Sequence, residues 1–262
     1  MDSSSVKFYH VDDFDTRAYL DEYFTTAGDS MILEHALRNP LNHLHNEFAS
    51  GDLKGDHLVD ISIGAIMFPL FPIFEYFKEI TILKLNDVCV NEIQKWIRSD
   101  EDAFNWDLAF KYMMELEGNS EGWQDKEEKL RKTIKSVVKC DLSKESLVDT
   151  VLVPKADCLF TAWILDTVSE DKTSYRQNLK KISSLIKPGG HLIMIADINT
   201  SWILVGGHKF HILSYDEDFF KNALKDEGYS IKFYEIVERD ECTDRSDYEK
   251  VVFVIACKER EV

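Results

Sequence analysis

The chain has 262 residues, of which 44% are hydrophobic and 30% charged, and its net charge of −17 corresponds to a sequence pI near 4.9. This acidic balance argues against nucleic-acid binding through a basic face, because phosphate contacts need clustered Lys and Arg. The longest apolar run, Ile61 to Phe74, is too short to span a bilayer and is interrupted by prolines, so we expect a globular protein with no membrane role.

The first part of the chain, residues 1–54, is predicted to be helical. One helix is expected to start at Asp15 and to be broken by Gly28, and a second is expected from Ser30 to about Phe48. Because this part shows no alternation of strands and helices, we interpret it as a helical lid or flanking layer.

From Gly55 onward the pattern alternates between strands and helices. The elements expected in the first half of this region are strands His57–Ile61 and Glu79–Leu85, helices Val90–Arg98 and Trp123–Val138, and a short third strand that ends at Lys139–Leu142. The apolar positions of the expected helix Trp123–Val138 recur at helical spacing and predict that one face of this helix packs against the core.

The second half begins with Ala156–Ile164, whose continuous apolar character predicts a strand buried on both faces of a parallel sheet. The elements expected after it are a helix Tyr175–Ile186 ended by Lys187-Pro188-Gly189-Gly190, a strand His191–Ala196 followed by Asp197, a helix opened by a Ser214/Glu217 capping box, and strands Ser230–Val237 and Val251–Cys257. The last two strands predict a hairpin that adds an antiparallel edge.

This order predicts one α/β domain over residues 1–262, with a doubly wound Rossmann-like core at 55–262. The five cysteines are odd in number and include no Cys-x-x-Cys pair, and Met1–Ser5 has neither the basic nor the apolar region of a signal peptide. These features predict reduced thiols and a cytoplasmic location.

Several short segments resemble a known family. The turn Leu185–Leu192 resembles the one before the fifth strand of Rossmann-like S-adenosylmethionine-dependent methyltransferases. The segments that are similar to the nicotinamide, indolethylamine and phenylethanolamine N-methyltransferases in particular are Phe77–Ile80, Glu92–Trp96, Glu115–Ser120, Lys126–Arg131 and Val138–Asp141. The resemblance covers nearly the whole chain. It implies a seven-stranded sheet, S-adenosylmethionine as cofactor, methyl transfer to an amine or pyridine nitrogen, and a monomer.

The resemblance also implies roles for individual residues. The cofactor-binding positions that match the family are Tyr19, Asp60, Gly64, Asp141 and Leu142. Asp197 matches the acid that orients the substrate, and Asp166 is also retained. Ile203 and Ile212 replace residues that are typically polar in the nicotinamide enzyme, so a small apolar amine or another apolar ligand is expected instead.

The cofactor motif departs from the family at its centre. The family reads Asp-Ile-Gly-Ser-Gly-Pro-Thr-Ile-Tyr, and this chain reads Asp60-Ile-Ser-Ile-Gly-Ala-Ile-Met-Phe68. Ser62 replaces a glycine, Ile63 and Ile66 replace hydroxyl residues, and Lys84 stands where an acid would accept hydrogen bonds from both ribose hydroxyls. A lysine ammonium has only donors, so these changes predict weakened or lost cofactor binding.

Two functional hypotheses remain open at this point. The first is a non-catalytic or ligand-binding member of the family, and the second is an active N-methyltransferase with an unusual cofactor pocket. Asp141 and Asp197 could alternatively be structural caps at strand ends, and Ile66–Phe74 could be core or the wall of an apolar cavity. No metal site is expected, since the His43/His45 and His208/His211 pairs have no third ligand nearby in the sequence.

Overall fold

A computed structural model of the protein describes residues 6–119, 121–144, 147–148 and 153–261. Met1–Ser5, where no signal peptide is expected, and Ser120 in one of the family-like segments lie outside the described residues. A seven-stranded sheet has the order β3-β2-β1-β4-β5-β9-β8. Its strands are β1 (Gly55–Ile61), β2 (Phe77–Lys84), β3 (Ile134–Lys139), β4 (Ala156–Ala162), β5 (Ile186–Ile198), β8 (Tyr229–Glu238) and β9 (Lys250–Lys258).

The strand directions confirm the expected mixed sheet. The first five strands pair in parallel, whereas β9 runs antiparallel to both β5 and β8. The strand order reverses between β1 and β4, and ligands of doubly wound sheets bind beyond the carboxyl ends of the strands at such a reversal. The topology therefore points to the loops after these two strands as the functional end.

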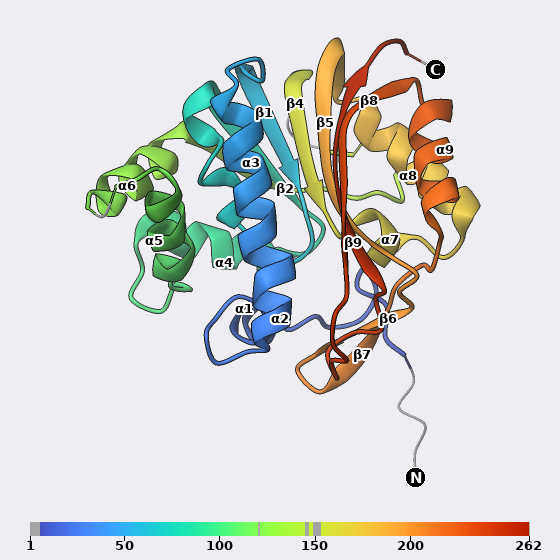
Figure 1. Ribbon diagram of the computed structural model, residues 1–262, viewed down its shortest axis with the longest axis horizontal. Helices are drawn as coiled ribbons and strands as arrows, with labels where there is room; N and C mark the ends of the chain where they lie inside the picture. The colour runs from blue at the N-terminus through green and yellow to red at the C-terminus, as the bar shows by residue number, and fades with distance from the viewer. Residues whose placement is uncertain (1–5, 120, 145–146, 149–152, 262) are drawn as a thin grey trace.

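Helices cover both faces of the sheet, with α3 on one side and α8 and α9 on the other (Figure 1). The helices are α1 (Thr16–Tyr23), α2 (Ser30–Leu33), α3 (Asn39–Ala49), α4 (Asp87–Arg98), α5 (Asp107–Leu116), α6 (Trp123–Thr133), α7 (Leu165–Val168), α8 (Lys172–Ser183) and α9 (Glu217–Asp226). A π-helical turn, Glu34–Arg38, joins α2 to α3, so the second predicted helix is present but irregular.

One predicted helix was too long. The helix expected over Trp123–Val138 ends at Thr133, and the chain continues directly as β3. The apolar positions Leu130, Ile134 and Val137 suit a helix, but pairing of β3 with β2 along residues 80–84 provides strand hydrogen bonds instead. The pairing of β3 with β2 therefore decides the structure of this segment, against the helical spacing of its apolar residues.

Other differences concern ends and short elements. The predicted helix at Tyr175 begins earlier, at Lys172, because Asp171 and Ser174 form a reciprocal capping box. Asp216, rather than the predicted Ser214, caps α9 by accepting the Phe219 amide at 2.8 Å. The Pro-Gly-Gly turn lies inside β5. Helix α5 and a two-stranded hairpin, β6 (Trp202–Val205) with β7 (His208–His211), were not expected.

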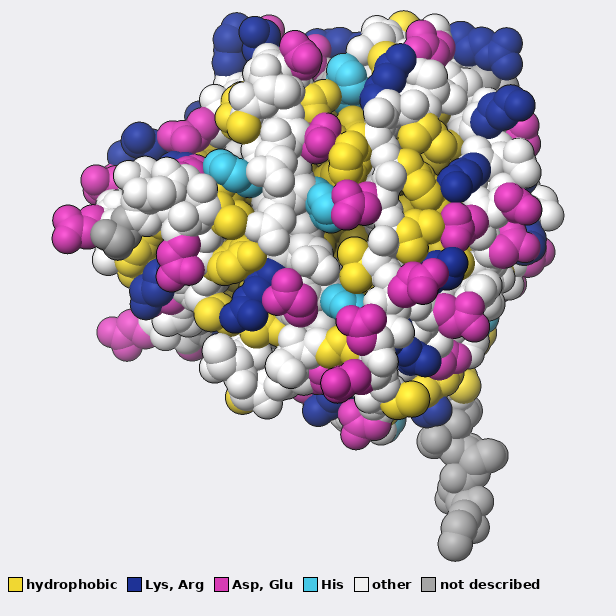
Figure 2. Space-filling view, in the orientation of Figure 1, with side chains coloured by type: hydrophobic (Ala, Val, Ile, Leu, Met, Phe, Trp, Pro, Cys, Tyr) yellow, Lys and Arg dark blue, Asp and Glu magenta, His cyan; other side chains and the backbone are white. Residues whose placement is uncertain are grey.

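The functional end of the sheet is where the N-terminal helices lie. Figure 1 shows α1, α2 and the β6–β7 hairpin gathered at the end toward which β1 and β4 run. The residues of Ile66–Phe74 are buried and belong to the hydrophobic core, as their core interpretation expected. No helix in the described part of the chain is long and apolar enough to cross a bilayer. Figure 2 shows acidic side chains spread over one face, with basic ones among them.

Candidate cofactor and substrate site

The turn after β1 is covered by the N-terminal segment. Gly64 has a φ of 57°, and a Cβ placed on it would lie 2.9 Å from Cδ1 of Tyr19. Its amide donates to the Tyr9 hydroxyl at 3.0 Å, and the Ala65 amide donates to the Thr16 hydroxyl at 3.1 Å. Glycine is needed here because of both the left-handed backbone and the close Tyr19 ring. These two turn amides are therefore bonded within the chain.

Next to this turn lies a buried ion pair. The Lys84 Nζ is 3.0 Å from Oδ2 of Asp60 and also donates to the Ser62 carbonyl at 3.0 Å. The Ser62 hydroxyl donates to Oδ1 of Asp60 at 2.8 Å and accepts the Ala162 amide at 3.0 Å. Both charged side chains are almost fully buried, with exposed fractions of 0% for Lys84 and 2% for Asp60. The network joins the ends of β1, β2 and β4.

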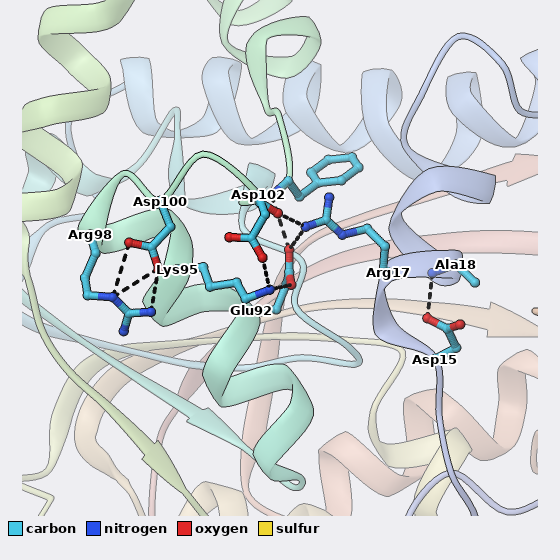
Figure 3. Close-up of polar contacts among 9 residues, drawn as sticks. Asp15, Arg17, Ala18, Glu92, Lys95, Arg98, Asp100 and Asp102 are labelled. Atoms are coloured by element: carbon cyan, nitrogen blue, oxygen red, sulfur yellow. Dashed lines mark hydrogen bonds and ion pairs between the residues drawn. The ribbon is translucent and has the colours of Figure 1, made fainter.

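A second group of polar contacts fastens α1 to α4, as Figure 3 shows. The Arg17 guanidinium is 2.6 Å from Oε1 of Glu92 and also donates to the Asp102 carbonyl. The same Glu92 oxygen accepts the Phe104 amide at 3.2 Å, and Lys95 bonds the Asp102 carboxylate at 2.5 Å. Because Glu92 is buried, this carboxylate joins α1, α4 and the loop after α4 at one point.

A small cavity lies beyond β4 and β5. It has a volume of about 40 Å³. The side chains around it include the predicted Tyr19 and Asp197, the retained Asp166, and Ile63, Trp163, Ile203 and Ile212. The Trp163 indole Nε1 donates to Oδ1 of Asp197 at 2.8 Å, while Oδ2 of Asp166 has no hydrogen-bond partner among the described residues. An isolated buried water needs about 10–15 Å³, so the cavity has room for a few waters.

Burial sets the ionisation of the two cavity carboxyl groups. Burial raises the pKa of Asp166 to about 7, and burial together with the nearby Asp166 charge raises the pKa of Asp197 to about 8. The phenol of Tyr19 has its pKa raised by burial and then by the neighbouring Tyr23. The cavity therefore disfavours negative charge, and it can hold its carboxyls protonated near neutral pH.

Two other predicted cofactor residues, Asp141 and Leu142, line a separate, open crevice. This crevice has a volume of about 620 Å³ and lies beyond β2 and β3, beside α8. Asp141 and Leu142 are in its wall, as is Asn86. The Asp141 carboxylate accepts from the amide and hydroxyl of Ser143, which lower its pKa, and the Leu142 carbonyl accepts from Lys181 at 2.5 Å.

The structure thus distributes the predicted site residues over three places. Tyr19 and Asp197 share the cavity, Asp141 and Leu142 share the crevice, and Asp60 and Gly64 line neither. The sequence did not reveal Tyr9 and Thr16 as partners of the turn, because they lie far from it along the chain. The Asp60–Lys84 pair could have been found, since both residues come at the ends of adjacent parallel strands.

Comparison with known proteins assigns the family. A model of the NNMT/PNMT/TEMT family matches residues 5–259. The chain belongs to this family. It is 32% identical to human nicotinamide N-methyltransferase over 253 residues, covering 95% of this chain and 94% of that protein. It is 34% identical to rabbit (Oryctolagus cuniculus) indolethylamine N-methyltransferase over 216 residues, covering 82% of each. Mouse phenylethanolamine N-methyltransferase is 32% identical over 250 residues, with 94% and 85% covered.

Solved structures place this NNMT/PNMT/TEMT family member within a wider fold. The N-methyltransferase NodS of Bradyrhizobium japonicum, solved in complex with S-adenosyl-L-homocysteine, superposes with a TM-score of 0.54 at 13% identity, covering 96% of this chain and 95% of that one. The [4+2]-cyclase SpnF superposes with a TM-score of 0.53 at 13% identity, covering 83% and 80%. Chains named for different reactions share this fold, so the activity depends on the site.

Proposed function

We propose that this protein is a non-catalytic member of the NNMT/PNMT/TEMT family, in which side chains of the chain itself replace the contacts to S-adenosylmethionine. The observation that carries the proposal is the buried network of Lys84, Asp60 and Ser62. By resemblance, the position of Lys84 should hold an acid that accepts from both ribose hydroxyls. Lys84 supplies donors only, and two of its three donors are bonded to Asp60 and the Ser62 carbonyl.

The turn after β1 supports the same conclusion. A bound cofactor would need the chain to approach it closely at Ser62 and Gly64, where small residues permit contact. Here the Ser62 side chain fills space between Asp60 and Ala162, and the Gly64 amide donates to Tyr9. The residues present therefore do not fit the cofactor at this end of the site, although the open crevice at Asp141 remains.

Direct binding tests the proposal. We expect no saturable heat in isothermal titration calorimetry and no thermal shift with S-adenosylmethionine or S-adenosylhomocysteine at millimolar concentration. Human nicotinamide N-methyltransferase in the same assay serves as the positive control. Saturable binding with a dissociation constant in the micromolar range would overturn the proposal.

The alternative is an active N-methyltransferase for a small, apolar amine. One observation favours it: Tyr19, Asp166 and Asp197, all retained from the family, meet in a single cavity with apolar walls. If this alternative holds, incubation with radiolabelled S-adenosylmethionine and a panel of apolar amines will give labelled product. The product will disappear in the Asp197→Asn variant, whereas the non-catalytic proposal expects none in either protein.

A further inference from the structure

Trp163 has an unusual backbone for so large a residue. It follows β4 directly, its φ is 52°, and the residue, which lines the cavity, is 9% exposed. Left-handed backbone is uncommon outside glycine, and for a bulky residue it persists only where the surroundings hold it in place. Three contacts do so: the Trp163 amide donates to the Ile195 carbonyl at 3.0 Å, its carbonyl accepts from the Thr167 hydroxyl at 2.5 Å, and its indole bonds Asp197.

The position of the indole matters because of what it contacts. Its Nε1 donates at 2.8 Å to Asp197, the carboxyl that family resemblance assigns to a substrate. If Trp163 only filled space, its indole N–H group would not need to point at the buried Asp197, and its backbone would not need the left-handed conformation. The volume left beside the ring, about 40 Å³, is far below the roughly 150 Å³ of a cavity that admits benzene.

We propose that the Trp163 side chain is a built-in occupant of the cavity, bonded to Asp197 in place of an external ligand, and that it is the residue that excludes flat aromatic molecules from the site. The inference deepens the proposed non-catalytic function and rests on it. If the Trp163 ring were removed, the space left would fit a ligand of the same shape and chemistry as the ring. Such a ligand is a neutral bicyclic aromatic molecule with one N–H donor. Indole is the corresponding free molecule.

The test uses the full chain with Trp163→Gly, because glycine accepts the left-handed backbone and leaves the space of the ring. We expect indole to bind this variant and raise its melting temperature, and to leave the wild type unchanged. Indene has nearly the same shape but no N–H group. It should bind the variant at least about tenfold more weakly than indole, because the hydrogen bond to Asp197 is lost.

Two further variants separate this proposal from ordinary cavity formation. Ile212→Ala enlarges the same cavity at another lining residue and leaves the Trp163 indole in place, so it should not bind indole. The double variant Trp163→Gly/Asp197→Ala should bind indole and indene equally. Equal binding of the two ligands by Trp163→Gly, or indole binding by the wild type or by Ile212→Ala, would overturn the proposal.

The glycine variant also gives an answer if it does not fold by itself. In that case refolding with millimolar indole should restore the far-ultraviolet circular dichroism of the wild type, and refolding with indene should not. Failure of indole to restore the signal would overturn the proposal. These measurements do not involve S-adenosylmethionine, so they are independent of the test of the proposed function. The indole experiment can contradict the role of Trp163 while the protein still fails to bind the cofactor. Equally, the protein can bind the cofactor while the indole experiment supports the role of Trp163.

Discussion

At the scale of single residues, Lys84 and Asp60 stabilise the structure only as a pair. Each would be an uncompensated charge in the interior without the other, and breaking a buried ion pair by removing one partner typically costs about 3–5 kcal/mol. From the sequence we could infer that Lys84 removes an acceptor from the ribose site. The carboxylate that it contacts was not inferred, although Asp60 and Lys84 come at the ends of strands that the sequence already predicted to be parallel.

Replacing one partner of this pair should therefore be worse than replacing both. Lys84→Met should lower the free energy of unfolding by about 3–5 kcal/mol, and adding Asp60→Asn should recover a large part of that loss. Urea denaturation of the two single variants and the double variant measures the coupling. Lys78→Met, which breaks the exposed Lys78–Asp56 pair, is the matched control and should change little. Additive effects of the two buried substitutions would contradict the expectation.

The cavity carboxyls make a second prediction, which concerns pH. The folded pKa of Asp166 is raised to about 7, above its ordinary value of 3.8, so the folded protein holds this proton more tightly than the unfolded chain does. Stability from this group is therefore lost as pH rises from about 4 to about 7, and the full penalty is present above pH 7. Asp197, with a pKa of about 8, extends the loss to higher pH.

Asp166→Asn should remove this penalty, since the amide oxygen can still accept the Thr167 amide. The variant should be more stable than the wild type at pH 9, by roughly 3–5 kcal/mol from about 1.4 kcal/mol per pKa unit, and nearly equal to it at pH 4. Urea midpoints across this range provide the measurement. The exposed Asp13→Asn serves as control. A gain that is the same at both pH values would mean that ionisation is not the cause.

At the scale of elements, the sequence predicted those whose signals are local. The strands of the seven-stranded sheet other than β3, and the α8 and α9 helices, carry continuous apolar runs or caps, and only their ends moved. One error came where distant pairing decides, since β3 looked helical until paired with β2. The β6–β7 hairpin was missed although Gly206-Gly207, both with positive φ, is a two-residue turn typical of hairpins, because its strands are only four residues long. The docking of α1 also depends on a distant contact, since Arg17 and Glu92 are 75 residues apart.

The Arg17–Glu92 contact should determine how firmly α1 is held against α4. Arg17→Met removes the guanidinium that joins Glu92 to the Asp102 carbonyl and leaves a buried carboxylate with fewer partners. Amide hydrogen exchange in Thr16–Tyr23 should then speed up by about tenfold or more, as expected for a loss of 1.5–3 kcal/mol. Mass spectrometry of the peptides from this helix provides the measurement.

Arg38→Met is the matched control for this exchange experiment. Arg38 is exposed to a similar degree, 41% against 38% for Arg17, and it pairs with Glu34 within the same helical segment. Its replacement should leave exchange in α1 unchanged. If both variants accelerate exchange in α1 equally, the Arg17 contact does not specifically hold the lid.

At the scale of the whole molecule, two separate parts of the chain supply side-chain contacts at the turn after β1. The core contributes the Lys84–Asp60–Ser62 network, and the N-terminal segment contributes the Tyr9 and Thr16 hydroxyls on the turn. The crevice at Asp141 stays open beside them. If, as proposed, either set of contacts alone prevents cofactor binding, their effects on that binding will be strongly non-additive.

This expectation leads to a combined variant. Lys84→Asp with Ser62→Gly restores the family's acid and glycine but leaves Tyr9 bonded to Gly64, and Tyr9→Ala frees that amide but leaves the ion pair. Each of these should bind S-adenosylhomocysteine no better than the wild type in calorimetry. The triple variant should gain saturable binding, since the acid at position 84 and the Gly64 amide are then both free of the contacts that Lys84 and Tyr9 make. Cofactor binding by the Lys84→Asp/Ser62→Gly protein alone would show that the N-terminal segment yields to the ligand and that the core substitutions carry the whole loss.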